Sequence, residues 1–382
     1  MRTRRLATVL VLAAALALAG CGGSGGTTTT AANATDATDA AGTATTTNSN
    51  QNVEYPAGVT ADGLQNRTAL FAADWTALNE SGFVADAWIN QSVSGRQSTN
   101  IAAYQRARVE SGGGNAALQI RRRSPSRDVD TNVWQNTTFG LTRIVETAPD
   151  GASATQFRRR DEVDRFRTNP ITSGGPASLV AIGEYDSVSV EGSGADTRIT
   201  LTADGVNETR ASGLRFNVSG YAGELVVDRT GRIRTIDVTL ETSGQQAAAY
   251  AVDYDLRRTG GTTVSRPAWF DRGLAQAPNV SVSAELVDGR YIALTNEGPD
   301  TLDADWQVQL QTRLAPLTGN LSTSVAPGET VYLSIANGSR QVQVTTTVPT
   351  DTRPLSGVRA VTVVEPSLTG QPYPIAGDGL TG

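Results

Sequence analysis

Carboxylates are the groups in this chain that could do chemistry, because it has 38 acidic residues but no histidine and no lysine. Without histidine there is no Ser-His or Cys-His pair and no imidazole base near neutral pH. Without lysine there is no Schiff base and no P-loop lysine. One cysteine and no histidine also exclude an ordinary zinc site. Two-carboxylate glycoside hydrolysis or a hard-cation site remains, but no spacing singles out a pair. We therefore expect no catalytic residue, no metal, no cofactor and no enzymatic activity.

Four short stretches could bind ions. "DVDTN" (residues 128–132) has the alternating oxygen ligands of a calcium loop, but Val133 stands where such a loop needs glycine, which favours a polar hairpin. "SGGGN" (residues 111–115) is a phosphate cradle or, between two strand-like runs, a turn. The arginine triplets 121–123 and 158–160 bind anionic groups or form solvated strand faces paired with acids. In each case the pattern favours a hairpin, a turn or a solvated strand face over ion binding.

The one cysteine, Cys21, could carry a lipid. Three arginines in the first five residues precede an apolar run over residues 6–19, the order typical of an export signal. Leu18–Gly20 followed by Cys21 has the order of a lipobox, in which the thiol is alkylated and becomes the anchored amino terminus. A buried or disulfide-bonded cysteine is the alternative, but the chain offers no second thiol and glycines follow the cysteine. The sequence therefore predicts a signal peptide over residues 1–20 and lipid attachment at Cys21.

The segment after this cysteine is polar and simple in composition. Residues 21–52 consist almost wholly of Gly, Ser, Thr, Ala, Asn and Asp, which cannot bury enough apolar surface to offset chain entropy. We expect a disordered stalk. Ten Asn-x-Ser/Thr sequons, more than chance predicts, indicate a glycosylated exported surface. The candidate glycosylation sites are Asn33, Asn66, Asn79, Asn90, Asn136, Asn207, Asn217, Asn279, Asn320 and Asn337.

The overall charge is negative. All 32 basic residues are arginine, and without the three in the signal the chain has 29 basic against 38 acidic residues, a net charge of −9. An acidic, lysine-free, threonine-rich chain is typical of exported proteins of halophilic archaea, where salt screens repulsion. Nucleic acid is not an expected partner of such a surface.

The elements that must position any site are mostly strands. Residues 66–82 have Phe71, Trp75 and Leu78 on one helical stripe, which predicts a helix that ends at Gly82, and a second short helix is expected over 177–185. Most of the following chain has period-two alternation, and "GELVVDRTGRIRTIDVTLE" (residues 223–241) predicts a hairpin. The expected fold is mainly β: a large antiparallel, half-barrel-like sheet with a few covering helices, then a small β-sandwich.

An amino-terminal helix, a long meander of strands, the hairpin 223–241 and the closing Pro267–Phe270 segment resemble the LolA/LppX-like lipoproteins of halophilic archaea. The resemblance covers about residues 53–275. It implies a half-open barrel whose concave apolar face holds acyl chains or other hydrophobic ligands, and it implies no catalytic residues. The apolar residues expected to line that face are Phe83, Ile120, Leu201, Phe216 and Val227.

The carboxy-terminal part is expected to be separate. Residues 278–366 contain short alternating strands with Gly, Pro and Asn about every ten residues, which predicts an immunoglobulin-like sandwich of about seven strands. Trp306 is expected in its core rather than at a binding surface. Residues 367–382 are rich in Gly and Pro, and we expect a loose tail.

Two classes of function follow. The first is a non-enzymatic lipoprotein on the extracellular face of the cell membrane, with a hydrophobic small molecule or lipid bound in the concave face of its sheet. The second is a structural or adhesive surface protein with a filled core, whose sandwich contacts proteins or glycans. A cavity lined by the apolar set favours the first, and a close-packed core favours the second. A two-carboxylate enzyme is a third alternative.

Overall fold

The structure is a computed structural model. It describes residues 53–95, 98–160, 175–211, 217–244, 247–312, 315–339, 341–365 and 373–380. The predicted signal peptide, Cys21, the stalk, Asn33 and Phe216 lie outside these residues. Among the helices that the structure describes, none is long and apolar enough to cross a bilayer.

The described chain divides into two compact units. The first contains the described residues within Met1–Ala77 and Thr168–Asp255, and the second contains those within Leu78–Arg167 and Leu256–Gly382. Each unit is mainly β, as predicted.

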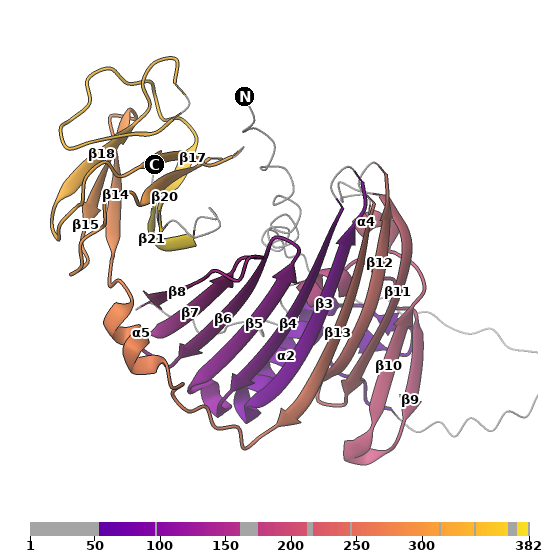
Figure 1. Cartoon of the computed structure of the whole chain (residues 1–382). Helices are drawn as coiled ribbons and strands as arrows, with labels where there is room; N and C mark the ends of the chain where they lie inside the picture. Colours follow the sequence, from indigo (N-terminus) through magenta and orange to yellow (C-terminus); the bar gives the residue numbers. More distant parts are fainter. Residues whose placement is uncertain are drawn as a thin grey trace, which may run out of the picture. The chain divides into compact units, whose positions relative to one another are not determined.

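Eleven strands form one antiparallel sheet in the order β8-β7-β6-β5-β4-β3-β13-β12-β11-β10-β9 (Figure 1). From the second unit come β3 (Phe83–Val93), β4 (Thr99–Val109), β5 (Ala116–Ser124), β6 (Arg127–Gln135), β7 (Gly140–Thr147) and β8 (Ser153–Arg160). The remaining strands are β9 (Ser187–Glu191), β10 (Arg198–Ala203), β11 (Asn217–Asp228), β12 (Ile233–Ser243) and β13 (Ala248–Thr259). The large antiparallel sheet of the predicted fold class is confirmed.

The predicted amino-terminal helix is α2 (Arg67–Ser81). The Asn66 side chain caps it, because its Oδ1 accepts a hydrogen bond from the amide of Ala69 at 3.1 Å. Its fully buried stripe contains Leu70, Asp74 and Leu78. Of the predicted stripe, Leu78 is fully buried, whereas Phe71 and Trp75, each one position away from a buried residue, are only partly buried. A buried carboxylate lies in the true stripe, so a search for apolar spacing misses it.

Small elements complete the first unit. They are β1 (Val59–Thr60), β2 (Gly63–Leu64), α3 (Gly175–Val180), the 3-10 turn η2 (Gly194–Asp196) and α4 (Glu208–Ala211). The short helix expected over 177–185 begins earlier and ends earlier, as α3. In the sheet of this unit, the apolar alternation of β10 to β13 is buried on one face. The predicted hairpin 223–241 is confirmed as β11 and β12, which pair antiparallel.

The ion-binding stretches of the second unit lie in or between strands. Residues 111–115 connect β4 to β5 through a 3-10 turn, η1 (Ser111–Gly113). Residues 128–132 belong to β6, and their carboxylates lie 3.7–3.9 Å from the guanidinium groups of Arg121 and Arg123 on β5. The described residues contain no cluster of three or more acidic, histidine or cysteine side chains that could hold a metal. The helix α5 (Phe270–Gln276) follows the sheet strands.

Two four-stranded antiparallel sheets, β14-β15-β18-β19 and β17-β16-β20-β21, follow α5 and share one apolar core. Their strands are β14 (Val282–Val287), β15 (Tyr291–Asn296), β16 (Gln307–Thr312), β17 (Leu317–Asn320), β18 (Thr330–Ser334), β19 (Gln343–Thr345), β20 (Val358–Glu365) and β21 (Tyr373–Gly379). Trp306 is 6% exposed and belongs to this core, as predicted. The immunoglobulin-like assignment stays a prediction.

One strand of this part, β21, falls within the segment expected to be a loose tail. It pairs with β20, and the register shifts between Val363 and Val364, next to Pro374. Because β21 is an edge strand, a proline is tolerated there beside an irregularity. The content of Gly and Pro alone therefore predicts a loose tail where the structure has a strand.

Candidate functional site

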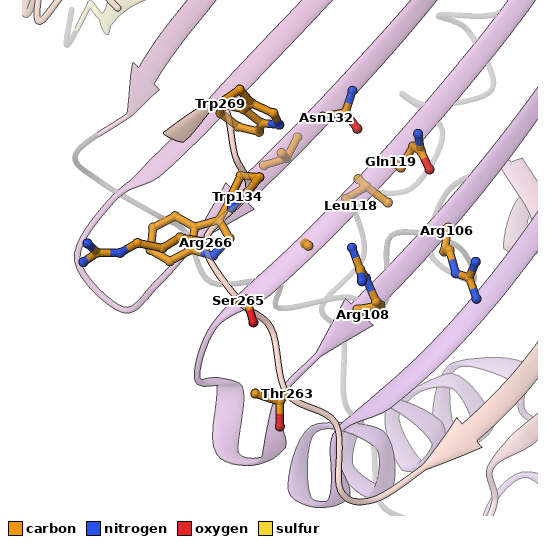
Figure 2. A pocket seen from close by; sticks show the side chains of 13 residues that line it. Arg106, Arg108, Leu118, Gln119, Asn132, Trp134, Thr263, Ser265, Arg266 and Trp269 are labelled. Atoms are coloured by element: carbon orange, nitrogen blue, oxygen red, sulfur yellow. The ribbon is translucent and has the colours of Figure 1, made fainter. Parts of the chain in front are cut away.

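A pocket of about 290 Å³ lies over β4, β5 and β6 in the second unit (Figure 2). Its volume is at the lower end of the range of small-molecule sites. Figure 2 shows that the segment from Thr263 to Trp269, which we call the crossing segment, crosses these strands and forms one wall of the pocket. The lining residues are Arg106, Arg108, Ala117, Leu118, Gln119, Asn132, Val133, Trp134, Thr263, Ser265, Arg266, Pro267 and Trp269.

The strand register explains why the surface is hollow here. Arg108 on β4 is paired with Ala117 on β5, which is paired with Trp134 on β6. Paired residues of antiparallel strands point to the same face, so these three side chains form one row. Two long side chains flank a methyl group across about 10 Å, twice the usual strand spacing. Ala117 is therefore the low point of the row.

A second row lies beside the first. Arg106 is paired with Gln119, which is paired with Asn132. This row is polar throughout, whereas the indoles of Trp134 and Trp269 lie toward the other end of the pocket (Figure 2). The pocket thus has a polar, cationic end and an aromatic end.

The crossing segment is fixed at both ends. Near its start, the amide of Val264 donates a hydrogen bond to Oε1 of Glu110 at 2.7 Å, and Oε2 accepts one from the amide of Asn115 at 3.0 Å. The hydrogen bond from Val264 holds the pKa of Glu110 below its usual range, which outweighs the effect of burial. A carboxylate that accepts two amide hydrogen bonds is well suited to hold one backbone segment against another.

Apolar packing fixes the other end. Phe270, which directly follows the segment, is 4% exposed and joins Trp134, Leu141, Phe157 and Ala277 in one cluster. A Cβ atom on Gly273 of α5 would come within about 3 Å of side-chain atoms of Leu141 and Phe157, so the helix lies very close to β7 and β8. The wall of the pocket is therefore anchored by the same residues that form its aromatic end.

The charge of the lining is one-sided. It contains three arginines and no acidic residue, although the whole chain has a net charge of −6. The guanidinium of Arg266 lies beyond Trp134, away from Arg106 and Arg108 (Figure 2), and its Cζ is 4.6 Å from the ring centre of Phe270. Arg266 therefore shields the aromatic cluster, and the cations of the polar end are Arg106 and Arg108.

These two arginines differ in their partners. Nε of Arg106 is 3.4 Å from Oδ1 of the buried Asp86, which also accepts a hydrogen bond from the Tyr104 hydroxyl. Burial and this bond raise the pKa of Tyr104. Oδ2 of Asp86 is 3.1 Å from Nε of Arg257, so one carboxylate is shared among three donors. Within the described residues, Arg108 has neither a hydrogen bond nor an ion pair.

Trp134 adds a second donor without a partner. The residue is 3% exposed, and its Nε1 makes no hydrogen bond in the described part of the chain. A buried indole N–H usually has an acceptor, because leaving it unpaired costs about 1–3 kcal/mol. The indole N–H of this pocket residue is therefore left without an acceptor in the described part of the chain.

The apolar residues expected to bind a ligand lie elsewhere. Phe83 on β3, Leu201 on β10 and Val227 on β11 are 0% exposed, and Ile120 on β5 is half-buried. None of these four lines the pocket. Ile120 follows Gln119 on the same strand, so it points to the opposite face of the sheet from the pocket. Leu201 and Val227 lie on adjacent strands, where Leu201 is paired with Leu225. Their role in ligand binding stays a prediction.

Nine predicted glycosylation sites lie in the described residues. Asn66, Asn90, Asn217, Asn320 and Asn337 are exposed, and Asn79, Asn136, Asn207 and Asn279 are partly buried. Oδ1 of Asn136 accepts two amide hydrogen bonds, from Thr138 and Phe139, which places it in a tight turn. Their occupancy stays a prediction.

Sequence reasoning missed the pocket residues Arg108, Trp134 and Trp269. The sequence feature that marks this site is "QRARV" (residues 105–109), in which two arginines point to the same side of a strand with no acidic residue between them. The strand pattern alone predicts that such side chains face solvent. Only the register with Ala117 and the position of the crossing segment turn them into a site.

No protein-family model matches the chain, and neither does any curated protein. Among solved structures, it is similar to a LolA superfamily protein from Nitrosomonas europaea, with 10% identity over 53% of this chain and 96% of that one, at a TM-score of 0.21. It is also similar to a chain of the Pseudomonas aeruginosa MucA/MucB complex, with 14% identity over 78% of this chain and 90% of that one, at a TM-score of 0.20. At these TM-scores the similarities carry no argument about function.

Proposed function

We propose that this chain is a lipid-anchored lipoprotein of the extracellular membrane face that binds a small ligand with an apolar part, without catalysing a reaction. The ligand is bound between the crossing segment and strands β4 to β6, with its apolar part against Trp134 and Trp269. The observation that carries this proposal is the hollow over Ala117, whose methyl group lies between the long side chains of Arg108 and Trp134 in one row of the sheet. The anchor rests on the predicted lipobox at Cys21.

Physical chemistry supports binding rather than catalysis at this pocket. Its lining has no carboxylate, so it lacks the general acid or base that the remaining chemistry of this chain would need. Two aromatic walls and a few polar groups are typical of a small-molecule site. The wall is held by Glu110 and by the aromatic cluster, so the pocket exists before a ligand arrives, which lowers the entropic cost of binding.

The experiment replaces Ala117 with a larger side chain that fills the hollow. The probe is N-phenyl-1-naphthylamine, an uncharged apolar dye that fluoresces when it leaves water, titrated into the full chain carrying Cys21→Ser so that no detergent competes. We expect Ala117→Phe to weaken dye binding at least tenfold, because the new ring occupies the space of the ligand.

The matched control is Ala102→Phe, an exposed alanine on the same face of β4 that does not line the pocket. It should leave the dye affinity unchanged. Equal binding by both variants and the parent, with all three folded by circular dichroism, would contradict this site.

A further inference from the structure

Two of the pocket groups that lack a partner in the described part of the chain, the Arg108 guanidinium and the Trp134 indole N–H, are hydrogen-bond donors. Arg108 is exposed and forms no ion pair or hydrogen bond within the described residues, and Nε1 of Trp134 is buried and unpaired there. A guanidinium and an indole N–H can only donate. A ligand that pairs with Arg108 must therefore supply an acceptor.

The acceptor is expected to be charged. Arg106 lies in the row next to Arg108 on the same strand face, and no acidic residue lines the pocket. Asp86 already serves Arg106, Arg257 and Tyr104, so it is not available to Arg108. Arginine side chains on one face bind oxyanions through charge-assisted bonds, which are about twice as strong as neutral ones.

The same pocket also has an apolar surface close to these arginines. Trp134 and Trp269 lie toward the end opposite Arg106 and Arg108 (Figure 2), and Ala117 separates Arg108 from Trp134. The site is thus divided between an oxyanion end and an aromatic end. A free inorganic anion would use only the first, and an uncharged hydrophobic molecule would use only the second.

We propose that the ligand is an anionic amphiphile, whose carboxylate, sulfate or phosphate group is bound by Arg108 and Arg106 while its apolar body lies against Trp134 and Trp269. This inference rests on the proposed function, since it names the chemical class of the molecule bound over Ala117. It narrows the hydrophobic small molecule or lipid that the sequence predicts, because the residues at the pocket select for charge as well as for apolar area.

The experiment compares two dyes that differ by one sulfonate. They are 8-anilinonaphthalene-1-sulfonate and N-phenyl-1-naphthylamine, titrated into the full chain carrying Cys21→Ser at one fixed salt concentration. We expect the sulfonate dye to bind about tenfold more tightly than the neutral dye, as one charge-assisted contact provides. Arg108→Met keeps the aliphatic stem and removes the charge, so it should abolish this difference, and the neutral dye titrated into the same variant measures any change in the apolar part of the site.

Arg122→Met is the control, because Arg122 is exposed on the opposite face of β5 and does not line the pocket. It should preserve the preference for the sulfonate dye. Equal affinities of the two dyes, or a preference that survives Arg108→Met, would overturn the anionic ligand while leaving the proposed site intact. Binding of neither dye above the Ala117→Phe level would instead refute the proposed function.

Sodium sulfate distinguishes an amphiphile from a free anion. Millimolar sulfate should displace the sulfonate dye only weakly, because it cannot contact the two indoles. Displacement at a sulfate concentration equal to the dissociation constant of the dye would show that the apolar body adds nothing, and the amphiphile would be wrong.

Discussion

Asp228 holds the turn between β11 and β12 through one carboxylate. Its Oδ1 accepts hydrogen bonds from the amide and hydroxyl of Thr230 and from the amide of Arg232, and its Oδ2 accepts two from Arg234, at 2.6–3.1 Å. Burial alone would raise the pKa of Asp228, but the bonds from Thr230 and Arg234 outweigh it and hold the pKa below the usual value.

This geometry predicts a pH-dependent loss of stability in Asp228→Asn. At pH 7 we expect the free energy of unfolding to fall by about 1.5–3 kcal/mol, the range for hydrogen bonds to a charged group. The carboxyl pKa is lower in the folded chain than in the unfolded one, so its stabilisation is complete above that unfolded value and is lost as the pH falls. The difference from the parent should therefore shrink below about pH 4.

Urea unfolding at several pH values measures this difference. Asp237→Asn, at an exposed position on the face of β12, is the control and should change stability little at any pH. The same loss in Asp228→Asn at pH 7 and at pH 3 would contradict a role for the charge.

The crossing segment shows how one side chain can fix an element. Glu110 directly follows β4 and accepts the amide hydrogen bond of Val264, which lies 154 positions later in the sequence. In Glu110→Ala we expect the Val264 amide to exchange its hydrogen about tenfold faster, since one charge-assisted bond is lost. Binding of the neutral dye should weaken as the wall of the pocket loosens.

Hydrogen exchange followed by mass spectrometry reports this change at the segment itself. Asp150→Ala removes a comparable bond, from the amide of Ala152 to a turn carboxylate between β7 and β8. That variant should leave exchange at Val264 unaltered. Unchanged exchange in Glu110→Ala would mean that apolar packing alone holds the segment.

Strands and the hairpin 223–241 could be predicted because alternation and turn residues are local signals. The helical stripe was misplaced because Asp74 is buried in it, where its Oδ1 accepts a hydrogen bond from the amide of Ile233, far away in the sequence. The pocket could not be predicted for a related reason. Apolar alternation marks the packed side of a strand, and it predicted Phe83 and Ile120 as ligand-binding residues. Arg108 and Trp134 lie in one row only because both are paired with Ala117 on the strand between them.

For the whole chain, the mainly β class followed from composition and spacing. The two sheets after α5 were also expected, but β21 was not, since a pairing partner cannot be seen in a Gly- and Pro-rich stretch. The exclusion of histidine and lysine chemistry depends only on which residues the chain contains.

Membrane attachment is a property of the whole chain that one substitution tests. Because Cys21 is the only thiol, Cys21→Ser should move the protein from the membrane fraction into the medium. Fractionation at high salt followed by immunoblotting measures this, with export itself confirmed by the size of the processed chain. Ser24→Ala, three residues further on, should remain in the membrane fraction. Retention of Cys21→Ser in membranes would disprove a lipid anchor at this position.

Each part of the large sheet runs in chain order: β3 to β8 follow one another in the second unit, and β9 to β12 do so in the first. Except for β10 and β11, neighbouring strands in these runs are joined by a connection of a few residues, so loop closure costs little entropy before they pair. Such local contacts favour rapid folding. We therefore expect each run to assemble hairpin by hairpin as the chain becomes available, with no wait for distant segments to meet.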